Sequence, residues 1–301
     1  MGEILFWGKL ALKKHYFYII LAAVFWGSMG IFVNSLSEFG LSTVQICLLR
    51  SVASLLLIGL LILFKDRSLF RICLKDIWMF LGTGVASYFL FNNCYFIAIR
   101  QVGVAVSSVL LYTSPIFVTL MSCLFFGERL TGKKILCIVL AVGGCALVSG
   151  LASGNAGEVS PVGILIGLAS GFTYALYSIF STFALKRYQP LTVTFYTFLF
   201  GSFACLWVAD PVYAFGAVAA PEGLLWLLAL GVITGAAPYF LYTKGLSGVQ
   251  PSHAAVIAAV EPVVASLIGI FFYRESADLF TVLGIVMILG ASILLSMKND
   301  K

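Results

Sequence analysis

Two charged residues lie within long apolar segments of the sequence. Glu261 lies in the run 251–273, and Arg50 lies in the run 43–64. Placing an ionised side chain at the centre of a lipid bilayer costs about 2.5–3.5 kcal/mol on insertion scales, so such residues are functional candidates. Glu261 has the chemistry to carry a coupling proton or to contact a substrate amine. Arg50 has the chemistry to pair with Glu261 or to hold a substrate carboxylate.

Each of these residues also has a structural interpretation. Glu261 shares a helical stripe with small residues such as Ala258 and Ala265, so it faces packed protein or a cavity rather than lipid. A neutral or hydrogen-bonded carboxyl in that position would serve stability alone. Arg50 shares a stripe with Cys47, and its long side chain could extend to the outer membrane interface. The sequence leaves these alternatives open.

Neutral polar and aromatic side chains recur along other apolar runs, many at spacings of three and four. A cavity with hydroxyl groups, amides and aromatic rings suits a small zwitterion or a metabolite with an apolar part. Small polar residues also allow close helix packing, so each assignment has a structural alternative. The candidate binding residues are Trp26, Asn34, Asn93, Ser108, Tyr112, Tyr174, Tyr177, Tyr239 and Tyr242.

Three prolines interrupt segments with the length and composition of helices. These are Pro115, Pro238 and Pro262. A proline inside a helix removes a backbone hydrogen bond and kinks the helix. The freed carbonyl groups could line a cavity and the kinks could act as hinges, or the kinks could simply be filled by neighbouring side chains.

The composition places these residues in a membrane protein. Of the 301 residues, 61% are hydrophobic and 10% are charged, whereas soluble domains carry about 25% charged residues. The net charge of +6 is spread over short loops and forms no patch, which argues against nucleic-acid binding. Seven unpaired cysteines, two histidines and the lack of a Walker motif predict no metal, no cofactor and no enzyme activity.

Ten apolar runs are long enough to cross a hydrocarbon core of about 30 Å. No small-residue cleavage site follows the first run, so we interpret it as a retained span rather than a signal peptide. The fold class is therefore an all-α membrane protein with ten transmembrane helices. The predicted spans are 16–36, 43–64, 77–99, 104–126, 135–152, 161–186, 191–209, 224–246, 251–273 and 279–297.

The basic residues predict the orientation of the chain. If the N-terminus is cytoplasmic, Arg100 and Arg274 are the only ones of the 18 Lys and Arg residues in predicted outside segments, and Arg50 lies in the membrane. Such a bias towards inside loops is typical of plasma-membrane proteins. We therefore expect a multi-pass protein of the plasma (inner) membrane with both termini cytoplasmic.

The two halves of the chain align without gaps. Pro115 matches Pro262, Glu128 matches Glu275, and Gly143 matches Gly290. Each half contains five predicted spans, so the second half enters the membrane inverted relative to the first. The predicted domains are residues 1–152, with spans one to five, and residues 161–301, with spans six to ten. Inverted repeats are common in secondary transporters, whose sites lie near the bilayer midplane.

On these features the chain resembles the EamA family of the drug/metabolite transporter superfamily. The resemblance rests on Pro115 followed by the Gly-Glu-Arg-Leu segment 127–130, and on the echo at Glu261-Pro262 followed by Arg274-Glu275. Arg50 also matches a recurrent arginine of the family. The echo departs from the pattern, because Arg274 replaces a glycine. The resemblance implies ten helices, cytoplasmic termini and a central cavity formed by spans one to four and six to nine.

The leading hypothesis is a secondary transporter that exports a small metabolite, such as an amino acid or a related compound, by alternating access. Its partners would be the solute, membrane lipid and protons as the coupling ion. Uptake of a similar solute and a non-transporting scaffold or receptor are the alternatives. Spans five and ten carry no polar residue beyond Ser, apart from Thr281 in span ten, and would serve as scaffold or as the surface of a homodimer.

Overall fold

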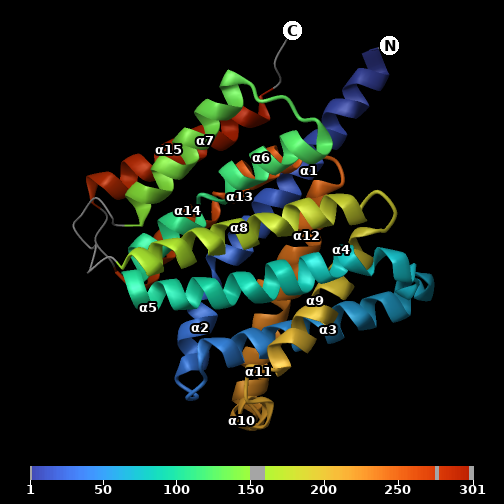
Figure 1. Ribbon diagram of the computed structural model, residues 1–301, viewed down its shortest axis with the longest axis vertical. Coiled ribbons are helices and arrows are strands. Elements are labelled where there is room, and N and C mark those ends of the chain that lie inside the picture. The colour runs from blue at the N-terminus through green and yellow to red at the C-terminus, as the bar shows by residue number, and fades with distance from the viewer. Residues whose placement is uncertain (1, 150–159, 275–277, 298–301) are drawn as a thin grey trace.

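The computed structural model describes residues 2–149, 160–274 and 278–297, with side chains from residue 13 onward. Every regular element within those residues is a helix (Figure 1). The α-helices are α1 Gly2–Gly27, α2 Met29–Ser37, α3 Thr43–Lys65, α4 Ile77–Leu81, α5 Leu90–Leu111, α6 Ser114–Phe126, α7 Gly132–Val148, α8 Pro161–Ala184, α9 Pro190–Leu206, α10 Pro211–Ala217, α11 Pro221–Ala229, α12 Ala237–Leu246, α13 Pro251–Ala258, α14 Glu261–Phe272 and α15 Leu279–Ser296.

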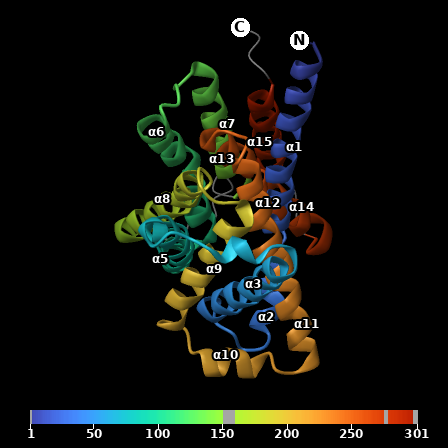
Figure 2. The same cartoon turned by 90° about the vertical axis from the view of Figure 1, so that its right-hand side faces the viewer.

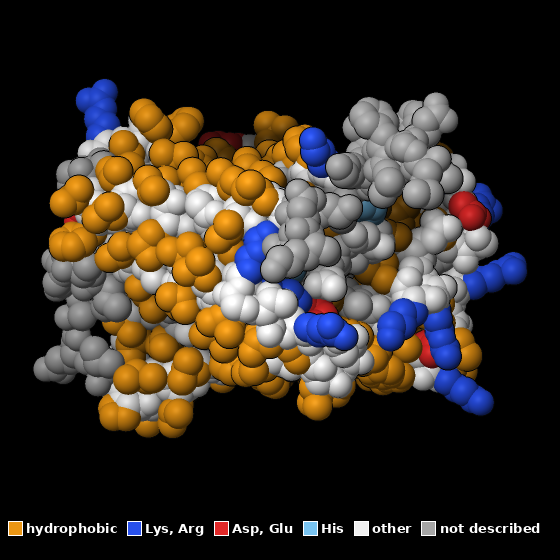
Figure 3. Space-filling view, turned by 90° about the horizontal axis from the view of Figure 1, so that it is seen from above, with side chains coloured by type: hydrophobic (Ala, Val, Ile, Leu, Met, Phe, Trp, Pro, Cys, Tyr) orange, Lys and Arg blue, Asp and Glu red, His pale blue; other side chains and the backbone are white. Residues whose placement is uncertain are grey.

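The surface of this bundle is apolar. Large side chains such as Leu124 and Phe271 are each 76% exposed, which water would disfavour and lipid would not. Figure 3 shows apolar side chains over most of one face, with Lys and Arg gathered towards one end. Among the described residues, seven helices are long and apolar enough to cross a membrane, and α9 with α10 forms a further, bent pair. The count of ten spans stays a prediction.

The chain reverses direction within α5. Gly103 has a φ of 76° inside an otherwise helical segment, a backbone conformation that favours glycine. The hydroxyl groups of Tyr95 and Ser108 are 3.0 Å apart, whereas a continuous helix would separate these residues by about 20 Å. The part of α5 before Gly103 and the part after it therefore lie side by side, as expected for two predicted spans.

Two π-helical segments occupy matching positions in the two halves. Gly82–Phe89 follows α4, and Leu230–Ala236 follows α11. In the alignment that pairs Pro115 with Pro262, the two segments end at the same position and their starts differ by one residue. A π-helical turn is an interruption of the regular α-helical hydrogen-bond pattern and is frequent at functional sites. Both halves therefore carry the same irregularity in their third span.

The prolines lie at matching helix breaks. α5 ends at Leu111 and α6 begins at Ser114, with Pro115 in its first turn. α13 ends at Ala258 and α14 begins at Glu261, with Pro262 in its first turn. Proline suits the first turn because its missing N–H would have no partner there. The fourth span of each half is thus two short helices rather than one kinked helix.

Each π-helical segment packs against a helix of the other half. A Cβ atom on Gly84 would lie 2.7 Å from the backbone oxygen of Thr197 in α9, and one on Gly231 would lie 2.5 Å from the Cβ of Ala53 in α3. The Thr197 and Thr83 hydroxyls are hydrogen-bonded at 2.8 Å. These close approaches connect the two halves reciprocally.

α7 and α15 form a separate pair at one edge of the molecule (Figure 2). Gly144 and Gly284 face each other across the pair, because a Cβ on Gly144 would lie 2.8 Å from the Gly284 oxygen and the reverse distance is 2.6 Å. Small residues let helices approach closely in membranes. The pair fits the scaffold interpretation of spans five and ten, and a homodimer stays a prediction.

The contact between Gly144 and Gly284 predicts that an added methyl group lowers thermal stability at these two positions but not at a glycine outside the contact. Gly144→Ala and Gly284→Ala should lower the midpoint of thermal unfolding by a few degrees, because the new Cβ overpacks the contact by about 1–3 kcal/mol. Gly290→Ala, in the same helix as Gly284, is the matched control. Its Cβ would meet nothing within 4 Å, so the higher helix propensity of alanine should leave stability unchanged or raised. Equal midpoints for all three variants in detergent would contradict the packing argument.

Candidate solute-binding cavity

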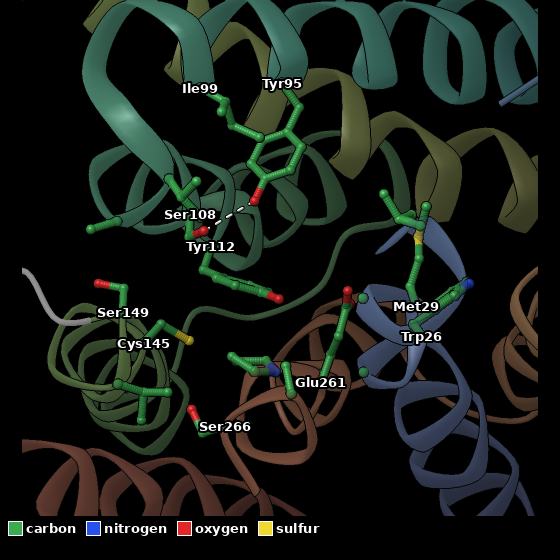
Figure 4. Close-up of a pocket in the computed structure, with 18 of the residues that line it drawn as sticks. Trp26, Met29, Tyr95, Ile99, Ser108, Tyr112, Cys145, Ser149, Glu261 and Ser266 are labelled. Carbon is green, nitrogen blue, oxygen red and sulfur yellow. Dashed lines mark hydrogen bonds between the residues drawn. The ribbon is translucent and has the colours of Figure 1, made fainter. Parts of the chain in front are cut away.

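A cavity of about 610 Å³ opens between the two halves. Its wall comes from α1, α2, the start of α3, α5 and α7 of the first half and from α14 of the second (Figure 4). The lining includes Arg100 and Ser149, which lie at the end of the bundle that holds the turn at Gly103. We name this end the Arg100 end. The predicted residues Trp26, Asn34, Ser108, Tyr112, Glu261 and Pro262 all line the cavity.

Glu261 stands at the break between α13 and α14. It is the first residue of α14, where the positive end of the helix dipole favours a carboxylate. Tyr174 from α8 donates a hydrogen bond to its Oε2 at 3.4 Å. In Figure 4, Glu261 points towards Tyr112 across the cavity. The helix break therefore presents an acid to the cavity rather than to lipid.

Arg50 lies deeper, and its side chain is 3% exposed. Its Nε donates to the Tyr88 hydroxyl at 3.1 Å, its Nη2 to Asn92 Oδ1 at 3.2 Å, and its Nη1 to the Met29 sulfur at 3.0 Å. This burial excludes the interpretation that Arg50 reaches the membrane interface. No ion pair joins Arg50 to Glu261 within the described part of the chain.

A smaller compartment of about 100 Å³ brings these two charges together. Both Arg50 and Glu261 line it, and so do the predicted residues Tyr174 and Tyr239. Six residues line both this compartment and the main cavity, and therefore form the boundary between them. They are Trp26, Met29, Tyr95, Phe96, Tyr112 and Glu261.

Aromatic rings close the floor beneath the compartment. Trp26 packs against Tyr239 with ring centroids 5.2 Å apart, and Tyr177 packs against Tyr239 at 5.1 Å. The Tyr177 hydroxyl is 2.7 Å from Thr243 Oγ1, and the Tyr242 hydroxyl is 2.7 Å from Ser178 Oγ. The predicted residues Tyr177 and Tyr242 thus belong to a closed layer that has almost no free volume.

A buried polar cluster lies at the opposite end of the bundle, where the loop between α6 and α7 and the first turn of α7 meet the start of α13. The Lys134 ammonium contacts Glu128 Oε2 at 2.6 Å, and both side chains are less than 10% exposed. Lys134 also donates to Gln250 Oε1 at 3.0 Å, and Ser252 donates to Glu128 Oε2. Gln250 and Ser252 belong to the start of α13. We name these four residues the Lys134 lock, because they tie the first half to the second.

A second polar contact joins the two halves at the same end of the bundle. Asp76, just before α4, accepts hydrogen bonds from Arg187 at 2.7 Å and from Tyr188 at 2.6 Å, in the turn after α8. The bond to Asp76 holds the pKa of Arg187 above its ordinary value, which keeps the guanidinium charged. Charged and polar side chains therefore join the two halves at this end. Towards the Arg100 end the cavity lies between the halves, beside the packing of α5 on the start of α8.

The structure places one predicted residue away from the cavities. Asn93 donates to the Phe89 carbonyl oxygen of its own helix at 2.9 Å and lines neither compartment. Its neighbour Asn92 contacts Arg50 instead. Successive helical residues point about 100° apart, so only one of the two can face inward. The π-helical segment before them shifts this register by an amount that sequence periodicity does not reveal.

Other residues of the site carried little sequence signal. Met29, Tyr88 and Phe91 look like ordinary apolar positions, although Tyr88 lies four residues before Asn92 on the same helical face. The hinge candidates Pro115 and Pro262 lie in the first turns of α6 and α14, and Pro238 lies in the first turn of α12, directly after a π-helical segment. Glu275, the match of Glu128, lies outside the described residues.

Fold and cavity together define a helical membrane protein with a solute-sized chamber between two related halves. The model of the EamA-like transporter family matches residues 13–150 and 161–297. The chain therefore belongs to the EamA-like transporter family and is an integral membrane transporter.

Individual relatives agree with this assignment. The chain is 31% identical over 282 residues to an uncharacterized transporter of Archaeoglobus fulgidus, with 90% of this chain and 92% of the relative covered. It is 29% identical over 287 residues to the pseudopaline exporter CntI of Pseudomonas aeruginosa, with 95% and 96% covered. A solved crystal structure with 15% identity superposes with a TM-score of 0.79 over 94% of this chain and 96% of the other, which supports the fold.

The geometry predicts unequal access to two serines. In a variant without the native cysteines, Ser266→Cys should react with a bulky water-soluble maleimide at least about tenfold faster than Ser178→Cys. Ser266 lines the open cavity, whereas Ser178 is 4% exposed in the aromatic layer. The measurement is the rate of labelling of purified protein, followed by mass spectrometry, with denatured protein as the control for intrinsic reactivity. Equal rates in the folded protein would contradict the closed aromatic floor.

Proposed function

We propose that this protein is a secondary transporter that moves a small metabolite by alternating access between two inverted repeats of five spans each. The observation that carries the proposal is the chamber between the halves, open at the Arg100 end and sealed at the other end by the Lys134 lock and the aromatic floor. A chamber with one open end is one of the two states that alternating access requires. The matching π-helical segments and proline breaks supply hinges in both halves.

The direction that we favour is export across the plasma membrane. The basic residues predict cytoplasmic termini and hence an outward-facing opening at the Arg100 end. Export is the activity named for the relative CntI. The polar and aromatic lining suits an amino acid or a related compound.

We further propose that Glu261 couples transport to protons. The carboxyl group faces the chamber at a helix break, lies within reach of Tyr174, and shares the inner compartment with Arg50. In the state with the chamber open at the Arg100 end, a carboxyl group in that position can exchange a proton with water. In the other state it loses access to that water. Proton gain and loss would then bias which end of the chamber is open.

Transport itself is testable without knowledge of the solute. Proteoliposomes are loaded with a low-molecular-mass metabolite extract under an imposed pH gradient, and the released solutes are identified by mass spectrometry. Wild-type vesicles should release a specific subset faster than protein-free vesicles. Glu261→Gln should abolish the dependence of release on the pH gradient, because the amide cannot ionise.

The matched control is Glu222→Gln, which removes an exposed carboxylate at the start of α11, outside the chamber. It should behave like wild type. If wild-type vesicles release nothing above background, the transport proposal is wrong. If Glu261→Gln transports with an unchanged response to pH, only the coupling role is wrong.

The Lys134 lock predicts a shift between the two states. Lys134→Gln should lower the labelling rate of Ser266→Cys from the Arg100 end by about fivefold or more, because the state with the lock closed loses a buried ion pair. Arg129→Gln is the control, since it removes the same charge from an exposed neighbour in the same loop. Labelling that stays unchanged in Lys134→Gln would show that the lock does not hold the chamber open at the Arg100 end.

A further inference from the structure

The guanidinium of Arg50 is buried with more donors than acceptors. A guanidinium carries five N–H donors, and Arg50 uses three of them on Tyr88, Asn92 and Met29. All three partners are neutral. Tyr88 itself donates its hydroxyl hydrogen to the Cys47 carbonyl oxygen at 3.0 Å, so it serves Arg50 only as an acceptor.

No carboxylate among the described residues forms a close ion pair with Arg50. A buried cation without an anion is strongly destabilising unless something compensates it. Glu261 lines the same compartment but forms no ion pair with Arg50. Arg50 therefore has N–H donors left for an anionic group from outside the chain, and Glu261 is the acid that shares its compartment.

Met29 occupies the place where such a group would bind. Its sulfur lies 3.0 Å from Nη1, and a thioether is a weak acceptor. Met29 begins α2, directly after the break at Ser28, and its side chain is unbranched and flexible. It also belongs to the boundary between the main cavity and the inner compartment. Movement of this one side chain would expose Arg50 to the cavity.

The dimensions of the compartment fit a small planar anion. Its volume of about 100 Å³ is several times the roughly 10–15 Å³ that a cavity needs to hold one water molecule. That is enough for a carboxylate group, while the main cavity can hold the rest of a solute. A guanidinium binds a carboxylate through two parallel charge-assisted hydrogen bonds, which are stronger than bonds to neutral acceptors.

We propose that Arg50 binds a carboxylate group of the transported solute and that Met29 occupies its Nη1 until the solute displaces it. The proposal rests on the transport function proposed above and adds a chemical requirement to it. A solute with an ammonium group as well would place that group towards Glu261 on the other side of the compartment. The substrate class is therefore a carboxylate-bearing metabolite.

The test compares amino acids with their carboxamides, which keep the shape and the ammonium group but lose the negative charge. Proteoliposomes are loaded with the protein amino acids and the matching amides, and the release of each member is measured by mass spectrometry. Wild type should release the transported acids about tenfold or more faster than their amides, as expected when a charge-assisted bond is lost. Arg50→Gln should bring this ratio close to one.

The ratio separates recognition from a merely structural role. If Arg50 only stabilised the fold, Arg50→Gln would lower the release of acids and amides alike and leave their ratio unchanged. That result would overturn the proposal. Equal release of acids and amides by wild type would also overturn it, and so would release of neither.

A second variant covers the case in which Arg50→Gln does not fold. Met29→Leu keeps the apolar volume but removes the sulfur acceptor, so the apparent affinity for acids should rise about two- to fivefold while that for amides stays unchanged. Met79→Leu, at a buried position in α4, is the matched control and should change neither. An equal shift for acids and amides in Met29→Leu would contradict the displacement.

The outcome also separates this inference from the transport proposal. If the metabolite-extract experiment detects transport only of solutes without a carboxylate, the Arg50 site is wrong and the transport function stands. If neither experiment detects release, both proposals fall.

Discussion

The need to satisfy backbone hydrogen bonds inside a membrane governs this structure. An unpaired N–H or C=O group in hydrocarbon costs several kcal/mol, so an irregular backbone persists at that depth only where protein or a water-filled cavity surrounds it. The breaks before α6 and α14 and the two π-helical segments are such irregularities. They occur at closely matching positions in the two halves, and the break before α14 opens directly onto the chamber. The cavity and the proposed hinges therefore lie at the same interruptions of the helices.

The two buried charges break the symmetry of the repeats. The residue that matches Glu261 in the first half is Ser114, and the residue that matches Arg50 in the second half is Thr197. The inherited repeat supplies the helices and their breaks in duplicate, but each charge occurs once. Because a charge in this environment is costly, its presence in only one half points to selection for the chamber rather than for the scaffold. Both charges line the same small compartment.

Sequence reasoning recovered the helical class, the repeat and most of the chamber. The apolar length of the runs, the paired prolines and the charge of Glu261 and Arg50 all follow from the cost of polar groups in lipid. It did not find Met29, which carries no polar signal, and it selected Asn93 although Asn92 faces Arg50. The π-helical register before Asn92 depends on packing against α9, such as the contact of Gly84 with Thr197. Contacts between residues so far apart in sequence produce no periodic pattern of apolar residues, so the sequence alone does not predict them.

The Lys134 lock explains why one end of the chamber is closed while the other is open. In an exact inverted repeat the two ends would have equal closing contacts and the two states equal free energies. The sequence repeats only one residue of the lock: Glu128 is matched by Glu275, whereas Lys134 is matched by Thr281, Gln250 by Gly103 and Ser252 by Ala105. Thr281 instead bonds Asp278 at the start of α15. Within the described residues, the Arg100 end does not reproduce the contacts of the lock. In the proposed transport cycle, closure there would therefore need free energy from the bound solute or from the charge state of Glu261.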